Sequence, residues 1–84
     1  MKKSKRGISV DQPIAYEIKI QGRLEERWSR WFDDMDIKVK SQTSGPTVTI
    51  LSGMVTDQAA LHGLLNRIRD LGIPLLSVQI MNSD

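Results

Sequence analysis

His62 is the only histidine in the chain, so any chemistry that needs an imidazole must start from this residue. Asn66 and Arg69 follow four and seven residues later, a spacing that places all three side chains on one ridge of a helix. Such a ridge could contact an anion or a protein partner. The same spacing is typical of the half-exposed boundary between the buried and solvent faces of a helix, and we favour this structural interpretation.

Three acidic residues, Asp33, Asp34 and Asp36, form the second cluster that could do chemistry. Carboxylate oxygens are the ligands that hard cations prefer. The glycine and the distant glutamate of a calcium-binding loop are missing, however, so the spacing favours a solvated turn.

The chain lacks the residues that the common catalytic sites require. Without cysteine it has no thiol nucleophile, thiolate metal site or disulfide. It also lacks a Ser-His-Asp spacing, a glycine-rich phosphate loop and a pair of metal ligands. We therefore expect a non-catalytic protein that carries no cofactor.

A helix in the second half of the chain is the best-defined element. Its apolar residues recur at offsets typical of one helix face: Leu61, Leu64, Leu65, Ile68 and Leu71. Thr56 or Asp57 can cap its start by accepting a hydrogen bond from a free backbone N–H. Gly72 can take the left-handed conformation after the last turn, and Pro74 prevents continuation.

The remaining elements follow from similar patterns. Residues 14–21 alternate apolar and polar side chains, which predicts a strand with one buried face. Residues 23–32 carry apolar side chains at helical spacing, and residues 37–40 predict a short edge strand with alternating lysines. A central strand at 47–54 and a last strand at 75–81 complete the series.

The predicted order is β-α-β-β-α-β. Right-handed crossovers in both halves give an α+β sandwich in which the antiparallel sheet has the order 4-1-3-2 and two helices lie on one face. This is the ferredoxin-like architecture. Two separate hairpins would fit worse, because each helix is flanked by strands that need a crossover.

The segments YEIKIQGRLEERWSRWF and TILSGMVTDQAALHGLLNRIRDLGIPLLSV, and above all the motif DQAALHGLL…RDLG, resemble a family of small uncharacterised prokaryotic proteins. The resemblance implies a ferredoxin-like fold and no assigned activity.

A looser similarity connects residues 55–57 and the leucine-rich helix after them to ACT domains, which are βαββαβ modules that sense amino acids. It implies an alternative role as a regulatory module that binds an amino acid or an anion. The ligand would bind where helix N-termini offer free N–H groups, at Gly22 and Arg23 or at Thr56 and Asp57.

Several side chains suit a protein partner. Trp31 or Phe32 could be left at the rim of a core too small for all the aromatic residues of 23–32, and Trp31 is the candidate contact. We expect Leu51 and Leu75 to lie on the sheet face opposite the helices, together with Thr47, Thr49 and Ser77. We interpret the chain as a self-associating module, most simply a homodimer. RNA binding is disfavoured because this face offers no aromatic platform for bases.

The net positive charge comes from the first thirteen residues, which hold four basic residues and one acidic residue. We interpret them as a flexible basic arm preceding a single domain at 14–84. Residues 14–84 carry eight basic and nine acidic side chains, so we expect only weak contacts of the arm with nucleic acid. No apolar run approaches the roughly 20 residues that cross a bilayer. We therefore expect a cytoplasmic protein without membrane contact.

Overall fold

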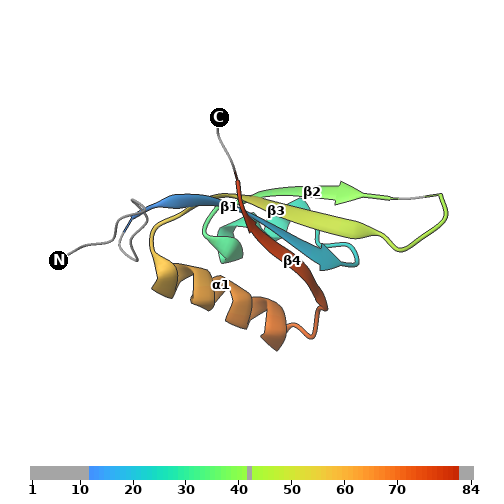
Figure 1. Ribbon diagram of the computed structural model, residues 1–84. Helices are drawn as coiled ribbons and strands as arrows, with labels where there is room; N and C mark the ends of the chain where they lie inside the picture. The colour runs from blue at the N-terminus through green and yellow to red at the C-terminus, as the bar shows by residue number, and fades with distance from the viewer. Residues whose placement is uncertain (1–11, 42, 82–84) are drawn as a thin grey trace.

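The computed structural model describes residues 12–41 and 43–81 (Figure 1). Most of the predicted basic arm therefore lies outside the described residues. The elements, in chain order, are β1 (Ile14–Gln21), the 3-10 helix η1 (Glu26–Phe32), β2 (Asp36–Lys40), β3 (Val48–Val55), α1 (Gln58–Asp70) and β4 (Leu75–Ile80).

The four strands form one antiparallel sheet with the order β2-β3-β1-β4. This is the predicted order read from the other side, so the predicted sheet is confirmed. Figure 1 shows α1 and η1 on the same side of the sheet, which leaves its other face open. The chain is thus an α+β structure with two helical segments over one sheet face.

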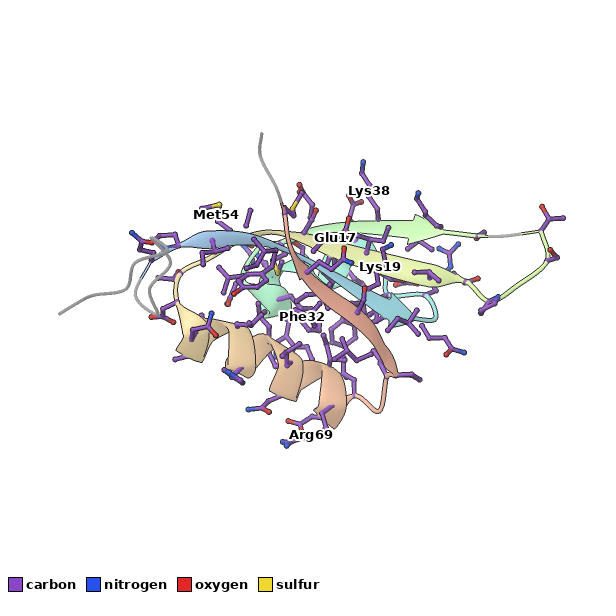
Figure 2. The ribbon with its side chains drawn as sticks, viewed as in Figure 1. Glu17, Lys19, Phe32, Lys38, Met54 and Arg69 are labelled. Atoms are coloured by element: carbon purple, nitrogen blue, oxygen red, sulfur yellow. The ribbon has the colours of Figure 1, made fainter. Side chains whose placement is uncertain are left out.

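The core lies between the sheet and the helical segments. Tyr16, Ile18 and Ile20 of β1 point into it, as the alternation of apolar residues predicts. Phe32 is fully buried, and Figure 2 shows it between the sheet and α1. The inner side of α1 contributes the buried side chains Leu61, Leu64 and Ile68.

The two ends of α1 follow the predicted signals. Of the two candidate caps it is Asp57 that closes the start, where its carboxylate accepts a hydrogen bond of 2.8 Å from the Ala60 N–H. At the other end Gly72 has φ +74, and its N–H donates to the Arg69 carbonyl. A residue with a Cβ would be strained in this left-handed conformation, so glycine gives the helix a sharp end.

The helix predicted over 23–32 is wrong in type and in its start. The structure has a 3-10 helix of seven residues that begins at Glu26. The Leu24 N–H donates to the Thr49 Oγ1 at 3.0 Å, and the backbone of Glu25 is extended with φ −73 and ψ 153, so the helix cannot begin before Glu26. The helix then ends where Asp33 takes the left-handed conformation.

The predicted orientation of the central strand is also wrong. Leu51 and Thr49 are fully buried under the helices, where Leu51 lies directly opposite Ile18 of β1. Residues opposite one another in a sheet share a face, so the buried face of β1 fixes that of β3. Leu51 therefore cannot be the predicted partner contact, and the open face instead carries Val48, Ile50, Ser52 and Met54.

Candidate functional site

The predicted ridge on α1 is exposed along its whole length. His62, Asn66 and Arg69 all reach solvent, and Figure 2 shows Arg69 on the side of α1 that faces away from the sheet. The Arg69 guanidinium pairs with its neighbour Asp70 at 3.2 Å. In residues 12–41 and 43–81, no three His, Cys, Asp or Glu side chains come close enough together to hold a metal ion. The ridge is therefore an open surface rather than an enclosed site.

Arg67 lies on another side of the same helix and joins the two helical segments. Its Nη1 donates to the Trp31 carbonyl oxygen at 2.9 Å and lies 3.5 Å from the Asp33 Oδ1. A cation suits this position because the carbonyl groups at the end of a helix carry partial negative charge. One carboxylate of the acidic cluster thus takes part in a surface ion pair, and Asp33, Asp34 and Asp36 are all exposed.

The aromatic residues of η1 contact one another in tilted and edge-to-face arrangements, and Trp31 lies at the edge of the core. The Trp31 ring lies 5.5 Å from Trp28 and 5.3 Å from Phe32, measured between ring centroids. Phe32 is buried, Trp28 is half-buried and Trp31 remains 42% exposed. Trp31 therefore lies at the rim of the core, one of the positions considered for it in the sequence analysis.

The two predicted ligand junctions are occupied by the chain's own hydrogen bonds. The Gly22 N–H donates to the Thr47 carbonyl at 2.7 Å, and the Gly22 carbonyl accepts from the Thr49 hydroxyl at 2.6 Å. At the other junction the Asp57 carboxylate already lies against the start of α1. Arg23 and Thr56 are exposed beside these groups. A shallow hollow of about 350 Å³ lies elsewhere, lined by Glu17, Gln79, Ile80 and Met81.

The open face of the sheet carries charges of both signs in ordered rows. The strand register places these side chains in two successive rows: Lys38, Ile50 and Lys19, then Asp36, Ser52 and Glu17. Figure 2 shows Lys38 and Met54 projecting from the side of the sheet opposite α1. The described part of this face bears no aromatic side chain, and base stacking on a sheet depends on such side chains.

Exposed apolar side chains gather on the last strand. Of the seven large apolar residues that are exposed in the described part of the chain, four lie at 75–81: Leu75, Leu76, Ile80 and Met81. Leu75 is a predicted contact, but its predicted place on the open face is wrong, because it lies opposite the buried Ile20 and so on the helix side. The other three are not predicted from the sequence. The available signal was the complete lack of charged residues from 71 to 81, in contrast to the lysines of β2. The two edge strands of the sheet thus differ sharply in character.

Neither helical segment in the described ranges is long and apolar enough to cross a bilayer. A search of curated proteins and a search of solved structures each gave no match to the chain. A family model described as a domain of unknown function (DUF8691) matches residues 15–79, a range that runs from the second residue of β1 to the last but one of β4. This match covers most of the chain, which therefore belongs to the DUF8691 family.

Proposed function

We propose that this chain is a non-catalytic interaction module with a ferredoxin-like fold, and that it associates with a second copy of itself. The observation that carries the proposal is the concentration of exposed apolar side chains on β4 and at Met81, the residue directly after it. Leu75, Leu76, Ile80 and Met81 are 43 to 51% exposed, although they follow one another within seven residues. Gathered apolar surface of this kind marks an interaction site, because water does not favour it.

The ferredoxin-like assignment is supported by the sheet order and by the position of both helical segments on one face. It leaves β2 and β4 as the two outer strands. We also propose a cytoplasmic location, with which the cysteine-free sequence is compatible.

Sedimentation velocity over a protein concentration range of about 1 to 100 μM tests the self-association, because mass action favours the dimer at the upper end. We expect the sedimenting mass to rise from that of one 9.5 kDa chain to that of two. A mass that stays at 9.5 kDa over the whole range would contradict the proposal.

A thermal-shift screen over amino acids and nucleotides provides the complementary test. If the chain is the interaction module that we propose, none of these compounds should raise the midpoint temperature of unfolding. A saturable rise in the midpoint temperature with one of them would instead favour the ACT-like alternative.

A further inference from the structure

We propose that two copies of the chain pair through the free edge of β4, antiparallel about Val78, so that their two sheets become one continuous sheet. This inference rests on the proposed function, since it assigns the surface by which the copies associate. Strand addition of this kind obtains its affinity from main-chain hydrogen bonds and its specificity from the side chains beside them.

The free edge of β4 presents a row of backbone groups that is regular from Ser77 to Ile80, while the register against β1 shifts at Leu76. In the described part of the chain β4 has a neighbour, β1, on one side only. The Met81 N–H donates to the Ala15 carbonyl at 2.8 Å, and the register continues with Gln79 opposite Glu17. Because backbone groups alternate in direction along an antiparallel strand, those of Val78 and Ile80 point away from β1.

The side chains at this edge are apolar and incompletely covered. Val78 and Ile80 lie opposite Ile18 and Tyr16, so they are on the helix side of the sheet. Ile80 is nevertheless 51% exposed and Leu76 is 49% exposed. A twofold axis at Val78 would set Leu76 opposite the partner's Ile80, and Ile80 opposite the partner's Leu76. Both apolar pairs would then lose solvent contact.

The charge distribution favours a second copy at β4 rather than at β2. β4 contains no charged residue, so two antiparallel copies of this strand place no like charges opposite each other. The opposite edge, β2, carries Lys38 and Lys40, and lysines on an edge strand oppose pairing with another chain. The sheet therefore has one edge suited to self-pairing and one edge protected against it.

Two matched lysine substitutions test which surface is used. Ile80→Lys places a charge at the proposed interface, whereas Met54→Lys places the same charge on the open sheet face. Both side chains are more than half exposed, at 51% and 61%, so both variants should keep the wild-type circular dichroism spectrum. We expect Ile80→Lys to raise the dimer dissociation constant on the order of tenfold or more, and Met54→Lys to change it by less than about twofold.

Single cysteines test the register, because the wild-type chain has no cysteine. Residues directly opposite in a hydrogen-bonded pair have Cα atoms about 5.5 Å apart, within the range of about 4.4 to 6.8 Å for a disulfide. Val78→Cys should therefore form an intermolecular disulfide under mild oxidation. Ser77→Cys is the control, since Ser77 would lie opposite the partner's Gln79 and too far from the partner's Ser77.

The outcomes separate this inference from the proposed function. A wild-type chain that is monomeric at all concentrations overturns both. A dimer that survives Ile80→Lys unchanged, or that dissociates with Met54→Lys instead, overturns edge pairing while self-association stands. Efficient cross-linking of Ser77→Cys without cross-linking of Val78→Cys overturns the register about Val78.

Discussion

We expect Thr49→Val to destabilise the fold by about 2 to 4 kcal/mol, although the two side chains have nearly the same shape. Thr49 is fully buried, and its hydroxyl connects two backbone groups on the segment between β1 and η1. It accepts from the Leu24 N–H at 3.0 Å and donates to the Gly22 carbonyl at 2.6 Å. Valine can make neither hydrogen bond.

The magnitude follows from what each group loses. The bond from the Leu24 N–H is buried, and a buried donor without an acceptor costs about 1 to 3 kcal/mol. Gly22 is partly exposed, so water can replace the lost donor and the cost is about 1 kcal/mol. At about 0.05 to 0.15 kcal/mol per residue, a chain of this length has a total stability of roughly 4 to 13 kcal/mol. The substitution therefore removes a large fraction of it.

Urea denaturation followed by tryptophan fluorescence measures this loss. Each variant should be compared at one protein concentration, since self-association makes apparent stability depend on concentration. Thr49→Ser is the matched control, because it keeps the hydroxyl and loses one methyl group, at a cost of about 1 kcal/mol. If Thr49→Val were as stable as Thr49→Ser or more so, the hydroxyl would not hold the connection between β1 and η1 as we describe.

Four further substitutions test other parts of the structure, each by urea denaturation unless stated. Leu64→Ala should cost about 2 to 5 kcal/mol, because Leu64 is 1% exposed and its truncation leaves a cavity. His62→Ala should change stability by less than about 0.5 kcal/mol, and a loss as large as that of Leu64→Ala would show that His62 is buried. Asp34→Gly should raise the midpoint of thermal unfolding and add about 0.5 kcal/mol, because Asp34 has φ 60; no gain would mean that this conformation is unstrained. Arg67→Ala should cost about 1 kcal/mol and alter the fluorescence emission of Trp31, because the Arg67 side chain donates to the Trp31 carbonyl. Unchanged emission would show that this hydrogen bond does not fix the position of Trp31.

Much of the fold could be predicted because the decisive patterns are local. The alternation in 14–21 encodes both the length of β1 and its buried face. The leucine spacing and the cap at Asp57 do the same for α1. Once these elements are known, the handedness of the crossovers leaves one sheet order.

The errors arose where contacts distant in sequence decide the local structure. β3 is an almost continuous apolar run, so its own pattern does not define a buried face; pairing of Leu51 with Ile18 does. η1 begins only at Glu26 because Glu25 is extended, and the segment before it is held by a bond between Leu24 and Thr49, which are 25 residues apart. No local propensity reports such a bond.

The candidate surfaces were only partly predictable for a related reason. The exposure of His62 and Arg69 follows from their place on an amphipathic helix. The exposure of Leu76 and Ile80 depends on the position of β4 at the border of the sheet. An apolar strand in the middle of a sheet and an apolar strand at its border can have the same sequence.

The contrast between the two outer strands determines how large an assembly can grow. A chain whose two edge strands can both pair with other copies can add copies without limit and form a fibre, whereas a chain with one such edge can bind only one other copy. With Lys38 and Lys40 on β2 and no charge on β4, the proposed pairing would use β4 alone. If the copies pair through β4 as proposed, the assembly stops at two copies, because the lysines of β2, at the opposite edge of each sheet, would oppose the addition of a third.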